Sequence, residues 1–217
     1  MVHRLPLLLA ASCLAACGAT QVQPQIKIPR ALITPMNLNV GVYYAPEFRK
    51  FEHRETRWGS DWKIALGEEH VRLTDDLFAQ AFTRTTPLTK FPSESEPAPV
   101  QAVIEPRIEQ YSFITPRDTG SDFYAVTIKY RLNLSTPTGS PVDSFQFTGY
   151  GVADSGGMSS EKPLRAATVT AMRDAAAKFL VQFPEQAAVK RLVRGETLVA
   201  ADSGQGTTEA EEMTLVD

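Results

Sequence analysis

Residues 123–134 read FYAVTIKYRLNL, and from Tyr124 to Leu134 apolar and polar side chains alternate one by one. This period of two is typical of a strand with one buried face. Residues 136–141 read TPTGSP and predict a turn, from which a second strand over 142–152 returns. The sequence therefore predicts an antiparallel hairpin, the most strongly indicated element of the fold.

Two further strands and two helices are predicted on either side of this hairpin. Alternation predicts strands over 38–44 and 101–113, and Pro106 favours an edge position or a bulge for the second of these. Apolar residues at helical spacing predict amphipathic helices over 67–85 and 161–183. Alanines in the later helix would let its backbone approach a sheet closely.

The order of these elements is strand-helix-strand-strand-strand-helix. It predicts an α+β fold, with a single mostly antiparallel sheet and two helices packed on one face. The opposite face of the sheet would then be free, either solvated or docked to a partner.

The N-terminal residues have the pattern of an export signal. A basic start precedes an apolar run over 5–14, which is shorter than the roughly 20 residues needed to span a bilayer. Residues 14–17 read LAAC and resemble the lipobox of bacterial lipoproteins, in which the cysteine is lipidated and becomes the first residue of the mature protein. This resemblance implies acyl chains on Cys17. An ordinary signal peptide with a chance cysteine is the alternative.

The chain of 217 residues divides into four parts on this interpretation. Residues 1–16 are the lipoprotein signal peptide, and 17–34 are the lipidated cysteine and a polar, flexible tether. Residues 35–193 form the α+β domain, and 194–217 form a flexible acidic tail.

Composition narrows the function classes. Hydrophobic residues make up 43% and charged residues 22%, which is ordinary for a globular protein, and the net charge of −3 argues against a nucleic-acid partner. The two cysteines are Cys13, inside the signal, and Cys17. The mature body would therefore have no thiol for a disulfide, a metal site or a nucleophile.

Catalytic signals are weak. The body retains His53 and His70, and Glu68 does not share a helix face with His70, so we expect no metal site. The serine-rich loop over 155–160 lacks the Gly-x-Ser-x-Gly pattern, although either histidine could meet it in space. We therefore expect no catalytic residue and no cofactor, and a periplasmic serine hydrolase is the weaker alternative.

Residues 43–63 combine aromatic and basic side chains, and they include both tryptophans of the chain. Such side chains are the usual anchors of binding surfaces, and arginine with tryptophan also suits an anionic lipid. The alternative is an extra hairpin over 58–66 that folds its aromatic rings back onto the core. The predicted contact residues are Phe48, Arg49, Arg54, Arg57, Trp58 and Trp62.

The lipobox, the element order and the hairpin together resemble small outer-membrane lipoproteins of bacteria. The similar families are the lipopolysaccharide-assembly lipoprotein and the auxiliary lipoproteins of lipid-transporting ABC systems, over about residues 35–185. This resemblance implies a non-enzymatic accessory role, with an envelope protein complex or an anionic lipid as partner. A structural subunit of an envelope machine is the alternative. Because Gly18 rather than aspartate follows Cys17, the resemblance implies the outer membrane, facing the periplasm.

Overall fold

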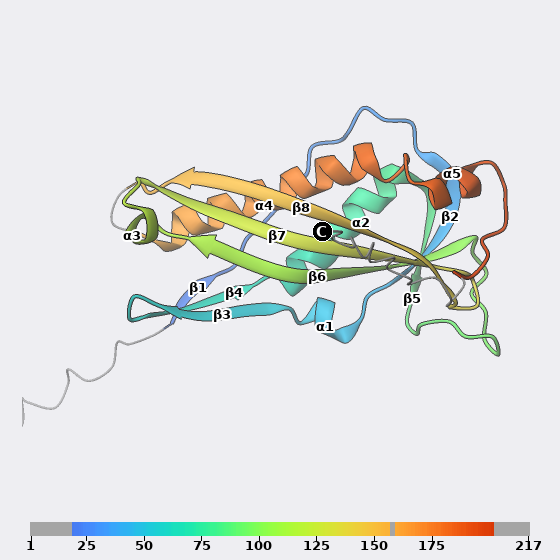
Figure 1. The fold of residues 1–217 in the computed structure, drawn as a ribbon, viewed down its shortest axis with the longest axis horizontal. Coiled ribbons are helices and arrows are strands. Elements are labelled where there is room, and N and C mark those ends of the chain that lie inside the picture. The colour runs from blue at the N-terminus through green and yellow to red at the C-terminus, as the bar shows by residue number, and fades with distance from the viewer. Residues whose placement is uncertain (1–18, 157–158, 202–217) are drawn as a thin grey trace, which may run out of the picture.

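The computed structural model describes residues 19–156 and 159–201, which form an α+β fold (Figure 1). The expected signal peptide over 1–16, Cys17 and residues 202–217 of the expected tail lie outside the described residues.

The larger sheet has five strands in the order β5-β2-β6-β7-β8. The strands are β2 (Met36–Tyr43), β5 (Phe82–Leu88), β6 (Ala102–Ile114), β7 (Phe123–Ser135) and β8 (Pro141–Asp154). The predicted hairpin is confirmed, because β7 and β8 pair in antiparallel register from one end to the other. β2 runs parallel to both of its neighbours, so the sheet is mixed.

A second sheet of three strands has the order β1-β4-β3, from β1 (Thr20–Val22), β3 (Glu52–Arg57) and β4 (Ser60–Ala65). β3 and β4 form a hairpin, and β1 pairs in parallel with β4, with Thr20 opposite Trp62. The α+β class is therefore confirmed, whereas the prediction of a single mostly antiparallel sheet is wrong. A strand of three residues is too short for alternation to reveal it.

The first long helix is shorter than predicted. α2 spans Gly67–Ala81, and the residues that follow form strand β5 instead of continuing the helix to residue 85. Phe82 keeps the helical spacing, but Thr83, Thr85 and Thr86 are β-branched and favour an extended chain. Pro87 is accommodated because β5 is an edge strand.

Both long helices cover the same face of the five-stranded sheet, and Figure 1 shows α4 behind β7 and β8. Phe179 of α4 (Glu161–Gln182) packs against Phe78 of α2 and Phe147 of β8, with ring centroids 5.3 and 5.9 Å apart. The short helices are α1 (Pro46–Arg49), α3 (Pro116–Thr119) and α5 (Ala187–Val193).

Two glycines let α4 approach β8 closely, as the alanine-rich helix predicted. A Cβ atom on Gly149 would lie 2.1 Å from the carbonyl oxygen of Ala171, and one on Gly151 would lie 2.0 Å from that of Ala167. Such distances are far inside van der Waals contact, so both positions require glycine.

Side chains of α4 also satisfy backbone groups on the outer edge of β8. The amide of Tyr150 donates a 2.8 Å hydrogen bond to Asp174, and Lys178 donates one of 2.8 Å to the carbonyl oxygen of Thr148. An edge strand whose polar groups are occupied in this way is less able to pair with another chain.

Pro106 lies on β6, an interior strand, so the predicted edge position is wrong for the strand as a whole. β2 pairs with β6 only over residues 102–104, and Pro106 lies just beyond the end of that ladder. Proline has no backbone N–H to donate, but no hydrogen bond to β2 is lost, because β2 does not pair with β6 at this residue. The register of β6 against β7 also shifts between Ile108 and Gln110, which is a bulge close to the proline.

The segments expected to flank the domain as flexible chain are packed against it where they are described. In the expected tether, Val22 is fully buried, and the amides of Ile26 and Ala31 donate to side chains of α2. At the other end, Leu198 is buried and the amide of Ala201 donates to the carbonyl oxygen of Pro141. The folded body therefore extends beyond residues 35–193 on both sides.

Candidate functional site

The segment over 43–63 folds as the end of β2, helix α1, strand β3 and most of strand β4. The β3–β4 hairpin spans residues 52–65, so the extra hairpin considered over 58–66 covers only its turn and its second strand. Phe48 and Trp62 are only 3% and 6% exposed, so these two predicted contact residues belong to the core. Phe48 stacks on Tyr44 with ring centroids 5.6 Å apart, and Trp62 packs against Phe113 at 5.3 Å. Neither side chain is available to a partner.

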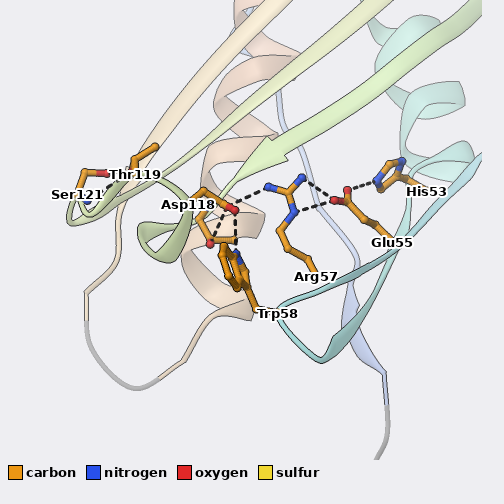
Figure 2. Close-up of polar contacts among 8 residues, drawn as sticks. His53, Glu55, Arg57, Trp58, Asp118, Thr119 and Ser121 are labelled. Atoms are coloured by element: carbon orange, nitrogen blue, oxygen red, sulfur yellow. Dashed lines mark hydrogen bonds and ion pairs between the residues drawn. The ribbon is translucent and has the colours of Figure 1, made fainter.

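Arg57 lies at the centre of a polar network on the inner face of the hairpin (Figure 2). Its Nε donates to Glu55 at 2.7 Å and its Nη1 to Asp118 at 2.9 Å, while its guanidinium lies 4.8 Å from the ring centre of Phe113. His53 contacts the other oxygen of Glu55 at 3.1 Å. The charge of Arg57 is therefore balanced within the protein.

Asp118 joins the hairpin to helix α3. It accepts hydrogen bonds from the amide and hydroxyl of Thr115 at 2.6 and 2.8 Å, and from Trp58 Nε1 at 2.8 Å. Partial burial raises the pKa of Asp118, but these hydrogen bonds and the Arg57 ion pair outweigh burial and hold the pKa well below its usual range. The carboxylate therefore remains charged at neutral pH.

Trp58 occupies an unusual position at the tip of the hairpin. It is 58% exposed and has a φ of 54°, followed by Gly59 with a φ of 74°. Two positive φ values in a two-residue connection are the pattern of a type I′ turn, whose first position favours asparagine, aspartate or glycine. A tryptophan there is a conformational outlier. Arg117 lies over its ring, 5.9 Å from the centre.

Three further cations of this segment, Arg49, Arg54 and Lys63, are also engaged by the protein. Arg54 donates to Glu52 at 2.6 Å, and Lys63 pairs with the same carboxylate at 3.0 Å. Arg49 donates to the carbonyl oxygen of Tyr44 and lies 5.1 Å from its ring centre. Arg49, Arg54, Arg57 and Trp58 therefore share a segment, but they do not converge on one positively charged surface.

His70 is a core residue. Its Nδ1 lies 2.8 Å from the carbonyl oxygen of Leu66 and its Nε2 lies 2.7 Å from the hydroxyl of Tyr130. Burial lowers the pKa of His70 to about 4, against a smaller opposing effect of the Leu66 hydrogen bond, so the ring is neutral at pH 7. The adjoining apolar cavity of about 50 Å³ has room for little more than a water molecule.

The face of the five-stranded sheet opposite the helices carries an uncharged patch that the sequence did not single out. Its side chains come from two adjacent rows of cross-strand neighbours on β6, β7 and β8. We call these residues the open-face patch: the first row is Ser112, Thr127 and Tyr150, and the second row is Ile114, Ala125 and Val152.

Tyr150 and Val152 are 58% and 56% exposed, which makes them the most accessible side chains of the open-face patch. Along β7 from Thr127, the next side chains on the same face are charged, namely Lys129 and Arg131. The alternation of Tyr150 and Val152 with the buried Phe145 and Phe147 was a signal that could have placed them on the open face.

In the described part of the chain, no group of histidine, cysteine or acidic side chains is arranged to hold a metal ion. Across the same residues, no helix has both the length and the apolar character to cross a membrane.

The chain matches no protein-family model and no curated protein. Among solved structures, it is similar to a Xanthomonas campestris protein of the family model DUF330, with 11% identity and a TM-score of 0.48, covering 74% of this chain and 92% of that one.

Two further similar structures have lower TM-scores. One is a Caulobacter crescentus protein described as a candidate lipoprotein, with 11% identity and a TM-score of 0.37, covering 58% of this chain and 81% of that one. The other is a hypothetical protein of Chlamydia trachomatis, with 12% identity and a TM-score of 0.39, covering 74% of this chain and 99% of that one. The function proposed below rests on the residues of this chain.

Proposed function

We propose that this protein is a non-enzymatic lipoprotein of the bacterial outer membrane, anchored through acyl chains on Cys17 and facing the periplasm. Its body binds a partner protein of the envelope through the open-face patch. The observation that carries the proposal is the LAAC sequence over 14–17, which ends three residues before the first strand of a folded body. One acyl chain gives only marginal binding, so we expect more than one on Cys17.

The charge balance of the hairpin supports a protein partner over an anionic lipid. The phosphates of such a lipid would need accessible cations. Arg57 is paired with Glu55 and Asp118, and Arg54 and Lys63 share Glu52. A phosphate at Arg57 or Lys63 would compete with these ion pairs, and Arg54, although its side chain is 72% exposed, already donates to Glu52.

The environments of the two histidines support a non-enzymatic role. Both ring nitrogens of His70 have partners in the core, and neither partner is a serine. His53 contacts Glu55 and packs against Tyr111, with ring centroids 5.1 Å apart. Among the described residues, no serine of the 155–160 loop hydrogen-bonds either histidine, which disfavours the serine-hydrolase alternative.

The open-face patch is suited to a protein partner because its own side chains are uncharged, because Tyr150 and Val152 are exposed, and because it is built on strands. The ammonium of Lys178 lies at its edge, 4.7 Å from the ring centre of Tyr150. Tyrosine is enriched at protein interfaces, and charged residues are depleted at their centres. The patch residues lie on three paired strands, so the surface is preformed and little conformational freedom would be lost on binding.

The anchor is tested by replacing Cys17 with serine. We expect the wild type to incorporate radiolabelled palmitate and to sediment with outer membranes, and C17S to appear as an uncleaved precursor or a soluble protein. Palmitate labelling and membrane association of C17S equal to those of the wild type would contradict the proposal.

The partner surface is tested by photo-crosslinking in living cells. A photoreactive amino acid at Val152 should give a discrete adduct with an envelope protein, while the same probe at Gln146, on the same face of β8, should give much less. Equal adducts at both positions, or none at Val152, would argue against the patch.

The identity of the crosslinked protein separates the accessory roles. A component of a lipid-transporting ABC system would support the transport-auxiliary role, and a component of lipopolysaccharide assembly would support that resemblance. Adducts with several subunits of one complex would support the structural-subunit alternative.

A further inference from the structure

We infer that the β3–β4 turn is a membrane-contact element, in which the ring of Trp58 lies in the interfacial layer of the same bilayer that holds the acyl chains of Cys17. This inference rests on the lipid anchor proposed above and adds to it an orientation of the body on the membrane.

Chain connectivity places the anchor close to the turn. Cys17 precedes Thr20 by three residues, which span at most about 11 Å in any conformation. Thr20 lies opposite Trp62 in a parallel pair, so the chain enters β1 at the end of β4 from which the turn projects. Figure 1 shows the start of β1, the β3–β4 turn and α3 at the same end of the molecule. A lipid on Cys17 therefore brings this end to the bilayer.

The exposed ring of Trp58 has the chemistry of an interfacial anchor. Tryptophan is enriched at membrane–water interfaces, where its apolar ring lies at the level of the headgroups. The indole N–H of Trp58 already donates to Asp118, so burying the ring in the interface leaves no donor unsatisfied. The same hydrogen bond holds the ring in one orientation, as Figure 2 shows.

The backbone of Trp58 is a second and independent observation. Positive φ is costly for a bulky side chain, and strained positions of this kind cluster at functional sites. Trp62, the other tryptophan, has an evident packing role in the core, whereas the ring of Trp58 is mostly in solvent. A functional role at the membrane accounts for a tryptophan at this turn.

No anionic lipid is needed for this contact. Arg57 is balanced by Glu55 and Asp118, and Arg117 lies over the Trp58 ring, 5.9 Å from its centre. The contact that we infer is made by the ring itself, so we expect it with a neutral bilayer, which sets this role apart from recognition of an anionic headgroup.

The test uses the lipidated full-length protein in vesicles of phosphatidylcholine whose acyl chains carry bromine near the headgroup. Bromine quenches tryptophan only at short range, and Trp58 and Trp62 are the two tryptophans of the chain. We expect bromination to reduce the emission of the wild type, and to leave the emission of W58F, which retains the buried Trp62, unchanged.

The outcomes separate this inference from the proposed anchor. If the protein does not float with the vesicles, the anchor itself fails. If it floats but the wild type is quenched no more than W58F, the orientation is wrong, even if Trp58 proves to be buried against a protein or a second copy. Quenching that appears only when phosphatidylglycerol is added would also overturn the neutral-interface contact.

Discussion

Arg57 of β3 and Asp118 of α3 form an ion pair with 2.9 Å between guanidinium Nη1 and carboxylate Oδ2. The two residues belong to different sheet systems: Arg57 lies in the small sheet, and Asp118 lies in the connection between β6 and β7 of the large one. The pair therefore fixes the hairpin tip to the body, together with the hydrogen bond from Trp58 to the same carboxylate.

Replacing Asp118 with asparagine should lower the free energy of unfolding by about 1–2 kcal/mol at pH 7, because charged hydrogen bonds are lost. The folded pKa of Asp118 lies below the unfolded value of about 3.9, so its stabilising effect is present above pH 4 and lost as the pH falls further. Urea unfolding should show the gap between wild type and D118N narrowing by about 1 kcal/mol from pH 7 to pH 3. A constant gap would show that the charge of Asp118 contributes nothing.

His70 should make the fold sensitive to mild acid. Its pKa falls from about 6.5 unfolded to about 4 folded, mainly through burial, so unfolding takes up a proton between these values. Stability is then complete above pH 6.5 and declines as the pH falls toward 4. We expect the wild type to lose about 2 kcal/mol between pH 7 and pH 5 by urea unfolding, relative to His70→Gln. Parallel pH profiles for the two proteins would contradict this prediction.

The close approach of α4 to β8 predicts that even one methyl group at Gly149 is disruptive. Gly149→Ala should destabilise the protein by about 1–3 kcal/mol, because the added Cβ meets the carbonyl oxygen of Ala171. The control is Thr148→Ala on the open side of the same strand, which should change stability by no more than about 0.5 kcal/mol. Thermal unfolding measures the stability of both variants. Equal melting temperatures for Gly149→Ala and Thr148→Ala would show that α4 can shift away from β8 without loss of stability.

Trp58 should contribute little to stability despite its hydrogen bond. Trp58→Asn relieves about 1 kcal/mol of left-handed strain and loses about as much with the bond to Asp118, so the net change should stay within about 1 kcal/mol. Trp58→Ala keeps the strain without the bond, and it should be the less stable of the two variants in urea. A loss above about 2 kcal/mol for Trp58→Asn would show that the side chain is mainly structural.

The sequence predicted the long elements of the fold and missed the short ones for physical reasons. The alternation over 123–134 and the turn after it predicted β7 and β8, because each strand has one buried face and one open face. β5 was predicted as the end of a helix, since Phe82 falls at a spacing that fits either structure. β1 has three residues and pairs with a strand more than thirty residues away, a contact that no local pattern encodes.

Of the six contact residues predicted from the sequence, Phe48 and Trp62 are buried and cannot meet a partner. Clustered aromatic residues do not reveal which rings point inward: Trp62 lies on the inner face of β4, whereas Trp58 lies in the turn. The pairing of Arg57 with Asp118 spans 61 residues and depends on how the two sheets meet. The sequence predicted that one face of the sheet is free, but it did not identify the residues of the open-face patch.

The packing of residues 20–31 on the body restricts where this protein can act. A free tether over 17–34 would let the body sample an r.m.s. distance of about 23 Å from its lipid. Because β1 begins at Thr20, three residues separate it from the proposed lipid attachment at Cys17, and three residues span at most about 11 Å. If Cys17 is lipidated as proposed, the body stays close to the membrane surface. A partner would then have to meet it there, where the high local concentration of both proteins would make even a weak contact effective.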